Sequence, residues 1–477
     1  MSTAASSSAA PAAINDRRFS SATWKTVTET FSERFGAAFQ TSDAIREQHG
    51  HTTTWIDNEP PDAVVFVSST EDVAFVVRTC AAHDVPVIPF GVGTSLEGHV
   101  NAPEGGISID LSRMNQVLSV NAQDFDCVVQ PGVTRKQLNA TLRDQGLFFP
   151  IDPGADATLG GMAATRASGT NAVRYGTMKN MVISVEAVLP NGSIVRTGHR
   201  ARKSSAGYDL TALLIGSEGT LGIITELTVR LFGIPEAVGS VAASFGSVAE
   251  ASEAVIATMQ YGVPVARIEL LDSLTVRAIN TYANLNFDEA PLLLVEFHGS
   301  ETAVAEYTDL FKAIVDDHGG SAMPSANSPE ERNRVWQARH DAYWASLTLR
   351  PGAKGLSTDI CVPISQLATC IGKAQARAEE DGFLAPIVGH VGDGNFHVLP
   401  LIDMDNEEEV TRAKAYVGWL NEMAIEAGGT CTGEHGIGQG KAPYLRRELG
   451  DAVDVMGAIK QALDPQNIMN PGKILPV

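Results

Sequence analysis

The pattern of apolar and polar residues predicts a βαβ unit early in the chain. Residues 63–67 form a short apolar run, Ser-Ser-Thr-Glu-Asp follows, and apolar residues then recur at helical spacing to about Ala82. Short apolar runs are typical of buried strands, and serine or threonine at this position is typical of a helix N-cap. Residues 85–90 predict a second strand, which runs into the loop 91–99, rich in Gly, Thr and Ser. Backbone N–H groups in such a loop are accessible to a phosphate.

The middle of the chain predicts a β-hairpin within a region of small residues. Residues 182–190 and 193–197 have strand patterns, and Asn191-Gly192 between them is typical of a type I′ turn. Between residues 150 and 225, Gly, Ala, Thr and Ser are abundant, which lets backbone approach a large flat or phosphorylated ligand. Flexible surface loops are the alternative, although flexible linkers rarely contain Ile, Leu, Met and Tyr so regularly.

Beyond Pro235, fewer glycines and alternating strand and helix patterns predict a second domain. Residues 265–270 and 292–297 are predicted strands, and the predicted amphipathic helices span 248–260, 301–317 and 406–427. We therefore expect an α+β protein with an α/β second domain laid over the first. The expected segments are a disordered tail at 1–20, a first domain at 21–235, a cap domain at 236–430, and a C-terminal segment at 431–477 that returns to the first domain.

Length and composition indicate a globular protein with two or three domains, because 477 residues exceed one ordinary core. The hydrophobic fraction of 44% and the charged fraction of 19% are those of a soluble protein. The five cysteines form no C-x-x-C pair, which disfavours disulfides, zinc fingers and iron-sulfur clusters. We expect a reducing compartment, either the cytoplasm or, in a eukaryote, the mitochondrion.

The formal net charge of −21 limits the partners. It repels phosphate backbones and anionic lipids, so we expect no nucleic-acid binding, whereas a basic protein partner is favoured. No apolar run reaches about 18 residues, so no membrane span is predicted, and attachment to a membrane surface stays open. The N-terminal residues, rich in Ala and Ser, lack the pattern of a secretory signal and are not Arg-rich.

Two short C-terminal segments carry the strongest candidate chemistry. His390 and His397 flank a glycine-rich reversal, Gly392-Asp-Gly394, and Glu434-His435 follow later. A strand-turn-strand of this kind lets both imidazoles face one point. Two neutral imidazoles and a carboxylate suit a divalent ion such as zinc, manganese or iron, and the remaining histidine is free to move a proton. Ordinary turn histidines are the alternative for either residue alone.

In this order along residues 55–475, these segments resemble the flavin-dependent D-2-hydroxyacid dehydrogenases of the vanillyl-alcohol oxidase superfamily. The nearest resemblance is to the cytochrome-linked D-lactate dehydrogenases; the glycolate oxidase D subunits and D-2-hydroxyglutarate dehydrogenases are relatives. The resemblance implies that residues 21–235 form a two-part FAD-binding domain of the vanillyl-alcohol oxidase (PCMH) type and that the cap covers the substrate.

The same resemblance implies which residues contact FAD. They are Pro89, Gly91, Val92, Gly93, Thr94, Ser95, Gly98, His99, Pro153, Gly154, Thr158, Gly160, Gly161, Ser168, Gly169, Tyr175, Gly176, Gly219, Gly222, Ile223, Ile224 and Asn470. Noncovalent FAD is expected. A flavin tethered to His99 is the alternative, because some relatives use a histidine of this loop, but its position matches theirs poorly.

The resemblance also implies roles for the C-terminal cluster. His390, His397 and Glu434 would hold one divalent metal, which lowers the pKa of the substrate hydroxyl. His435 would take the hydroxyl proton while the flavin takes the hydride, and the metal would keep this histidine neutral. Arg339 matches the arginine that binds the substrate carboxylate, a task suited to a bidentate guanidinium. A salt bridge on a helix surface is the alternative for Arg339.

The expected substrate is small. Hydroxyglutarate enzymes of the family usually carry a lysine near Ser357 and an asparagine near Leu399, and neither is present. D-Lactate or another small or apolar D-2-hydroxyacid is therefore expected. The alternatives are a glycolate oxidase subunit, a hydroxyglutarate dehydrogenase and a noncatalytic FAD-binding subunit. Reduced FAD would need an external acceptor, such as cytochrome c or a quinone, with dioxygen as the alternative, and a homodimer is the candidate assembly.

Three further residues have predicted structural roles. Asn395 follows two glycines and is interpreted as a turn former rather than a ligand. Tyr343 and Trp344 are candidates for the substrate pocket, but aromatic residues on an amphipathic helix more often belong to the core.

Overall fold

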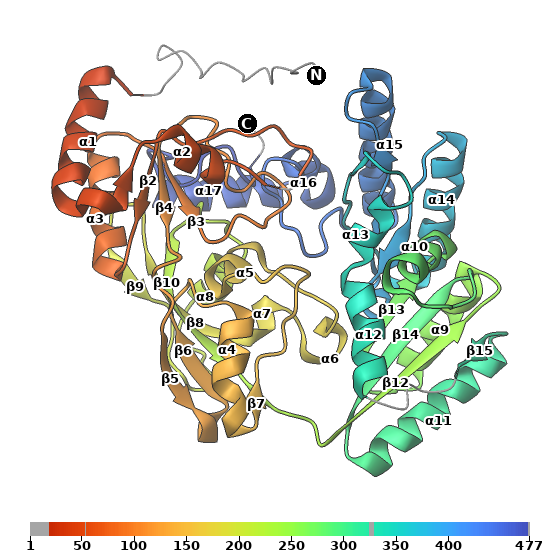
Figure 1. Ribbon diagram of the computed structural model, residues 1–477. Coiled ribbons are helices and arrows are strands. Elements are labelled where there is room, and N and C mark those ends of the chain that lie inside the picture. The colour runs from red at the N-terminus through yellow and green to blue at the C-terminus, as the bar shows by residue number, and fades with distance from the viewer. Residues whose placement is uncertain (1–18, 53, 324–328, 476–477) are drawn as a thin grey trace.

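The computed structural model describes residues 19–52, 54–323 and 329–475, so nearly all of the predicted tail at 1–20 lies outside the described residues. The described part contains sheets of four, five and seven strands and two smaller strand pairs. Figure 1 shows the first two sheets, one above the other, in one half of the molecule, and the seven-stranded sheet with its helices in the other half. The predicted α+β class is confirmed.

The first sheet contains the predicted βαβ unit with one addition. β2 (Ala63–Phe66) and β3 (Val87–Phe90) run parallel, but β4 (Ile107–Asp110) lies between them and pairs with both. Between β2 and β3 comes α3 (Thr70–Ala82), which begins after Ser69, whose side chain accepts the N–H of Asp72. The other elements of this layer are α1 (Ser21–Phe35), β1 (Phe39–Gln40) and α2 (Asp43–His49).

The second sheet contains the predicted hairpin. β8 (Val182–Val188) and β9 (Ile194–Arg196) pair in antiparallel fashion, and Gly192 in their turn has φ of +77°. The sheet order is β5-β6-β10-β8-β9, with β5 (Val117–Asn121), β6 (Asp126–Val129) and β10 (Ile223–Arg230). The neighbouring elements are α4 (Arg135–Leu142), β7 (Leu147–Phe148), α5 (Leu159–Thr165), α6 (Ala172–Tyr175), α7 (Met178–Met181), α8 (Leu210–Leu214) and β11 (Phe232–Gly233).

The third sheet forms the cap, and its strands all pair in antiparallel fashion in the order β15-β12-β14-β13-β18-β19-β17. Its strands are β12 (Ala237–Ser244), β13 (Val265–Leu271), β14 (Leu292–Gly299), β15 (Ser321–Ala322), β17 (Ile360–Cys361), β18 (Ile387–Gly389) and β19 (Asn395–Val398). The cap helices are α9 (Val248–Gln260), α10 (Ser273–Ala283), α11 (Glu301–Asp317), α12 (Pro329–His340), α13 (Ala342–Leu347), α14 (Leu367–Glu380) and α15 (Glu407–Glu426). A separate two-stranded sheet of the cap consists of β16 (Lys354–Gly355) and β20 (Leu401–Ile402). The strands and helices predicted in this region are confirmed, with ends that differ by at most two residues.

The C-terminal segment contacts the first sheet. After α16 (Ala442–Leu449) and α17 (Ala452–Leu463), the N–H of Val87 donates to the carbonyl of Ile468, and the N–H of Asn470 donates to the carbonyl of Val87. Ile468 and Met469 are fully buried in the core beneath this sheet. The C-terminal chain thereby lies beside the 91–99 loop, which continues from β3.

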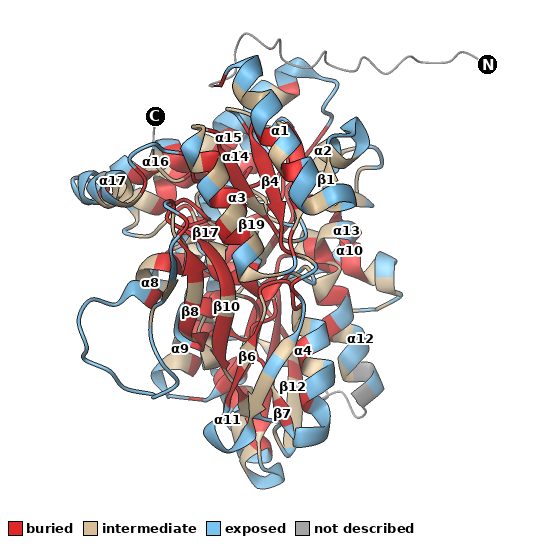
Figure 2. Ribbon diagram, turned by 90° about the vertical axis from the view of Figure 1, so that its left-hand side faces the viewer, coloured by how far each residue is buried: buried red, intermediate tan, exposed pale blue. Residues whose placement is uncertain are grey.

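A packed apolar core supports the cap. Phe297 of β14 and Phe311 of α11 are fully buried with ring centroids 6.0 Å apart, and Tyr416 of α15 is also buried. Figure 2 shows the same arrangement for the whole molecule, with buried strands beneath helices whose outer faces are exposed. Close packing of this kind holds the strand ends in fixed positions. None of the described helices combines the length and apolar character needed to cross a membrane.

We predict that Phe297→Ala destabilises the protein by about 3–5 kcal/mol, because it leaves a cavity between β14 and α11. The denaturation midpoint of the purified holoprotein, followed by circular dichroism, measures the effect. Tyr261→Ala is the control: this side chain is 71% exposed, so its loss should shift the midpoint little. Equal midpoints for the two variants would contradict the assigned core.

Candidate active site

A cavity of about 650 Å³ lies between the first two sheets and the cap. Loops of the first domain line one side, and α13, β18, β19 and the 434–435 peptide line the other. A volume of this order is typical of small-molecule and cofactor sites. The residues predicted to bind FAD, metal or substrate all line this cavity, except Gly98, Tyr175 and Gly176.

These three residues face protein groups instead. The Tyr175 hydroxyl lies 2.8 Å from Nδ1 of His298, because α6 packs against the cap sheet. A Cβ on Gly176 would lie 2.6 Å from Oδ1 of Asn180, and one on Gly98 would lie 2.5 Å from Oε1 of Gln439. A glycine-rich sequence indicates close approach of some group but does not say which one.

The wall formed by the first domain has features that fit a bound cofactor. Gly219 has φ of +74°, and a Cβ at this position would overlap the ring of Pro89, so the Gly219 backbone lies directly against this ring at the cavity wall. Buried polar atoms without a hydrogen-bond partner among the described residues include Ser95 Oγ, His99 Nδ1 and Asn470 Oδ1. Buried polar atoms are normally paired, so a ligand with polar groups would complete this wall.

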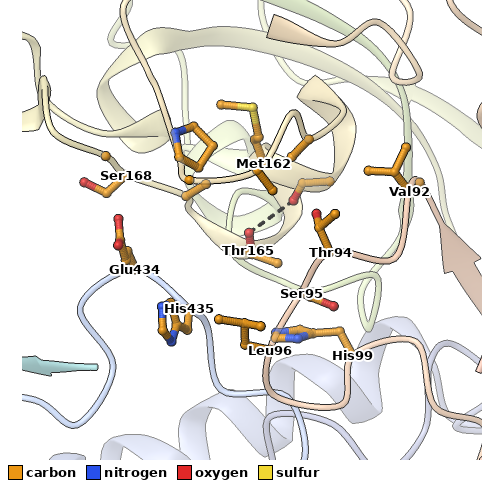
Figure 3. Close-up of a pocket in the computed structure, with 18 of the residues that line it drawn as sticks. Val92, Thr94, Ser95, Leu96, His99, Met162, Thr165, Ser168, Glu434 and His435 are labelled. Atoms are coloured by element: carbon orange, nitrogen blue, oxygen red, sulfur yellow. Dashed lines mark hydrogen bonds between the residues drawn. The ribbon is translucent and has the colours of Figure 1, made fainter. Parts of the chain in front are cut away.

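The C-terminal loop lies against the end of this wall. Figure 3 shows Glu434 and His435 on that loop, with His435 beside Leu96 and His99 of the 91–99 loop. The chain therefore brings together segments separated by more than three hundred positions in the printed sequence. It also places the candidate proton acceptor next to the candidate cofactor site.

His390 and His397 converge as predicted. His390 follows β18, His397 lies on β19, and Val388 of β18 is paired with His397. Their ring centroids are 5.4 Å apart. Nε2 of His390 lies 3.2 Å from Oε1 of Glu434, and Nε2 of His397 lies 3.4 Å from the same oxygen. Ligand atoms of the three residues all lie within 4.8 Å of one another, a spacing that could hold a metal ion.

The other nitrogen of each ring is already engaged. Nδ1 of His390 lies 2.7 Å from Oε1 of Glu269, and Nδ1 of His397 lies 2.8 Å from the carbonyl of Thr358. Each contact is with an acceptor, so each Nδ1 is expected to carry a proton. Nε2 of each ring points toward Glu434 and is the nitrogen available to an ion. This arrangement is typical of histidines that bind metals.

The electrostatics of the cluster favour a cation. Burial disfavours the charged form of His390, but Glu269 and Glu434 outweigh burial and raise the pKa of this histidine well above its ordinary value. Burial would also raise the pKa of Glu434, but His390 and His397 outweigh it and lower that pKa well below its ordinary value. A divalent ion could take the place of the proton that the two carboxylates retain on His390.

A buried aspartate holds the Glu434-His435 peptide. Oδ2 of Asp359 accepts the N–H of Glu434 at 2.7 Å and the N–H of His435 at 2.8 Å. The ring of His435 stacks on that of His397, with centroids 5.3 Å apart, and its Nδ1 has no hydrogen-bond partner among the described residues. Burial lowers the pKa of His435, although Asp359 opposes the shift. His435 is therefore neutral near pH 7 with a ring nitrogen free to accept a proton.

Glu269 is a site residue that the sequence reasoning missed. This fully buried side chain on β13 contacts His390 through Oε1, and its Oε2 accepts Nε of Arg339 at 2.8 Å and Nη2 at 2.5 Å. Burial would raise the pKa of Glu269, but Arg339 and His390 outweigh it and lower the pKa. A single glutamate within the apolar predicted strand 265–270 was the available signal.

Two secondary predictions have different outcomes. Asn395 lies at the start of β19 and takes part in the turn as predicted, because its N–H donates to the carbonyl of His390 at 3.3 Å; its Nδ2 also donates to Oδ1 of Asp359 at 2.8 Å and so anchors the aspartate. Trp344 is 55% exposed at the cavity wall and is not a core residue, whereas Tyr343 beside it also lines the cavity. Helical periodicity did not distinguish the core face of this short helix from the cavity face.

Comparisons with known proteins define the class of protein. Residues 61–198 match the FAD binding domain family, and residues 234–474 match the C-terminal domain of FAD linked oxidases. The chain belongs to the FAD-linked oxidases, and FAD is its cofactor.

Relatives and solved structures give a finer comparison. A probable mitochondrial D-lactate dehydrogenase of Danio rerio is 50% identical and covers 91% of this chain and 88% of its own. A mitochondrial D-lactate dehydrogenase [cytochrome] of Arabidopsis thaliana is 46% identical and covers 87% and 74%. The 4-ethylphenol oxidase of Gulosibacter chungangensis has the same fold, with a TM-score of 0.78 at 18% identity, covering 96% of this chain and 98% of its own. The expected vanillyl-alcohol oxidase type of fold is confirmed.

We predict that Gly219→Ala reduces the FAD content of the purified protein, because the added methyl group strains a left-handed backbone and collides with Pro89. The ratio of flavin absorbance to protein absorbance gives the measurement. Gly372→Ala is the matched control, because its Cβ would meet no atom within 4 Å and it lies in α14, away from the cavity. Full FAD retention in Gly219→Ala would contradict the assigned cofactor wall.

Proposed function

We propose that the protein oxidises D-lactate to the 2-oxoacid. The observation that carries this proposal is the cluster of His390, His397, Glu434 and His435 on the cap side of the FAD cavity. Sequence comparison also supports the proposal, because the chain is 50% and 46% identical to two relatives named D-lactate dehydrogenase. FAD, when bound, supplies the acceptor for the hydride of the substrate α-carbon.

His390, His397 and Glu434 would hold one divalent ion, zinc, manganese or iron, because imidazole and carboxylate ligands accept all three. The ion, when bound, would polarise the substrate hydroxyl. The support is the donor set: two Nε2 atoms face one carboxylate oxygen, each Nδ1 contacts an acceptor, and Oε2 of Glu434 has no partner among the described residues. Glu269 would orient His390 and reinforce its basicity.

His435 would accept the hydroxyl proton, since its ring is neutral and one nitrogen is free. Arg339 would bind the substrate carboxylate from the opposite side of the cluster. Glu269 engages the Nε and Nη2 edge of Arg339, which leaves the Nη1 N–H groups and the second N–H of Nη2 for the expected bidentate contact with the substrate carboxylate. Glu269 would thus fix both the candidate metal ligand and the substrate-binding arginine.

The wall beside the cluster favours a small or apolar substrate side chain. Side chains two residues apart along a strand lie on the same face. Pro386 and Val388 lie four and two residues before His390, and Leu399 lies two residues after His397, so these three side chains share a face with the imidazoles. None of these three side chains offers a charge for a distal carboxylate, so a hydroxyglutarate substrate is not favoured. The glycolate oxidase alternative is not favoured because the relatives at 50% and 46% identity are named D-lactate dehydrogenase.

Electrons would leave reduced FAD for an external acceptor. Cytochrome c fits the name of the Arabidopsis thaliana relative, and its basic surface would be attracted by the net charge of −21. We also propose a mitochondrial location if the source is eukaryotic, because the Danio rerio and Arabidopsis thaliana relatives are named mitochondrial, and a cytoplasmic one otherwise.

The central prediction is that D-lactate bleaches the FAD of the purified holoprotein under anaerobic conditions, whereas L-lactate does not. His435→Ala should slow this bleaching by about 10²–10⁴-fold, the usual contribution of a general base, while FAD stays bound. Stopped-flow absorbance of the flavin provides the measurement.

His199→Ala is the control for this experiment, because His199 is exposed and lies outside the cavity. Absence of bleaching by any D-2-hydroxyacid in the unmodified protein would overturn the proposed activity. Bleaching of His435→Ala at the full rate would remove His435 from the proton-transfer role only.

The ion should also be needed for bleaching. We expect a chelator to suppress it and added Zn²⁺ or Mn²⁺ to restore it. Glu269→Gln should raise the ion concentration required for half-restoration by about 10- to 100-fold, because an amide cannot replace the carboxylate beside His390. Titration of the chelated protein with each ion measures this requirement.

Glu296→Gln is a matched control for Glu269→Gln. Glu296 is likewise a buried glutamate of the cap sheet that bridges a histidine and an arginine, with Oε1 2.7 Å from Nε2 of His298 and 3.2 Å from Nη2 of Arg267. It lies outside the cavity, so its substitution should leave the ion requirement unchanged. Indifference of the protein to both chelator and ions would remove the metal from the mechanism.

A further inference from the structure

The peptide that carries His435 is anchored from both sides of the cavity. On the cap side, Oδ2 of Asp359 accepts the N–H groups of Glu434 and His435. On the side of the first domain, Oε1 of Glu218 accepts the N–H of Ile437 at 2.6 Å, and Oε2 accepts the N–H of Gly438 at 2.8 Å. Two buried carboxylates therefore hold four N–H groups within five consecutive residues. Hydrogen bonds to ionised carboxylates are roughly twice as strong as those between neutral groups.

Glu218 is itself fixed in the first domain. It has φ of +52° in the turn that follows α8, its N–H donates to the carbonyl of Ala164 at 2.9 Å, and its carbonyl accepts Nδ2 of Asn470 at 2.7 Å. Its side chain is 4% exposed, and Ser217, Glu218 and Gly219 all line the cavity. The carboxylate consequently has a defined position relative to the FAD wall.

Contact between the loop and the first domain is close at Gly436. This residue has φ of +82°, and a Cβ on it would lie 2.7 Å from both Oε1 of Glu218 and Nε2 of His99. Next along the chain, the N–H of Gln439 donates to the carbonyl of Glu97 at 2.7 Å. The loop thus passes from cap contacts to first-domain contacts directly after His435.

We propose that Glu218 is a positioning residue that sets the location of His435 relative to the flavin. The candidate metal ligands His390 and His397 lie on or next to cap strands, and Asp359 on the cap side holds the N–H of Glu434, so contacts with the cap would place the ion and the substrate hydroxyl. The contacts of Glu218 place the far end of the loop against the FAD wall. This inference rests on the proposed role of His435 as the proton acceptor.

Substitution of Glu218 by glutamine should disturb the loop without removing the ion site. A carboxylate accepts both N–H groups, whereas an amide accepts one and presents its NH₂ to the other. One donor in the 437–438 peptide would then be unpaired, and the loop would shift. A misplacement of catalytic geometry by about 1 Å can lower a rate by about 10²-fold.

The test uses the full-length holoprotein and D-lactate in anaerobic stopped flow. We expect Glu218→Gln to retain FAD and the ion and to bleach about 10- to 100-fold more slowly at saturating D-lactate. The half-saturating concentration should change by less than about threefold, because the cap still holds the substrate. The solvent deuterium isotope effect should rise, since proton transfer to a misplaced histidine becomes slower. Glu186→Gln, which alters another hydrogen-bonded carboxylate of the first domain, should behave as the unmodified protein does.

A second variant approaches the same contact from the loop. Gly436→Ala places a methyl group against Glu218 and His99, so it should give the same combination of slower bleaching, raised solvent isotope effect and retained FAD and ion. The inference would be overturned if Glu218→Gln lost FAD or the ion while Gly436→Ala bleached at the normal rate. Glu218 would then have a purely structural role. A slowed rate with an unchanged solvent isotope effect in both variants would overturn it as well.

The comparison with His435→Ala separates this inference from the proposed function. If His435→Ala is slow and both loop variants are normal, the positioning role of Glu218 is wrong and the proposed function stands. If His435→Ala bleaches at the full rate, the proton-transfer role of His435 fails first, and the positioning role fails with it.

Discussion

The arrangement of the site depends on how buried carboxylates are neutralised. Glu269, Asp359 and Glu218 are at most 4% exposed, and a buried carboxylate is tolerated only when donors or cations surround it. Each of the three carboxylates is neutralised by a different set of groups. Glu269 contacts an arginine and a histidine, Asp359 takes two backbone N–H groups and an amide, and Glu218 takes two backbone N–H groups. These requirements fix the orientations of the groups that line the cavity, so electrostatics and geometry are coupled here.

The two domains contribute different chemistry to the cavity. The first domain supplies a wall of small residues and unpaired polar atoms that fits FAD, built on the turns after β3 and before β10. The cap supplies imidazoles from the β18–β19 turn and from β19, and an arginine from α12, where packed strands and helices hold them. The peptide 434–438 contacts both domains and carries the candidate proton acceptor. An active site of this kind is complete only when the domains are docked.

Much of this organisation was predictable from sequence because it is local. The run at 63–67, the Asn191-Gly192 turn and the glycine reversal between His390 and His397 each depend on neighbouring residues, and the structure confirms them. The position of β4 between β2 and β3 was not predictable, since periodicity carries no spatial order. Glu269 and Glu218 were missed for a related reason. Their partners lie more than sixty positions away in sequence, and a single carboxylate in an apolar stretch does not name its partner.

Tyr175 illustrates the same limit from the opposite side. The small-residue segment around it suggested a cofactor contact, yet its hydroxyl meets His298, which in turn contacts Glu296 and thereby Arg267. These contacts link α6 of the first domain to β13 and β14 of the cap, so the Tyr175 side chain contributes to docking of the two domains. Each polar contact between the domains contributes less stability than burial of an apolar core does. Several such contacts together constrain the orientation of one domain relative to the other. Polar residues that a sequence motif suggests as ligand contacts can therefore serve to align the first domain with the cap.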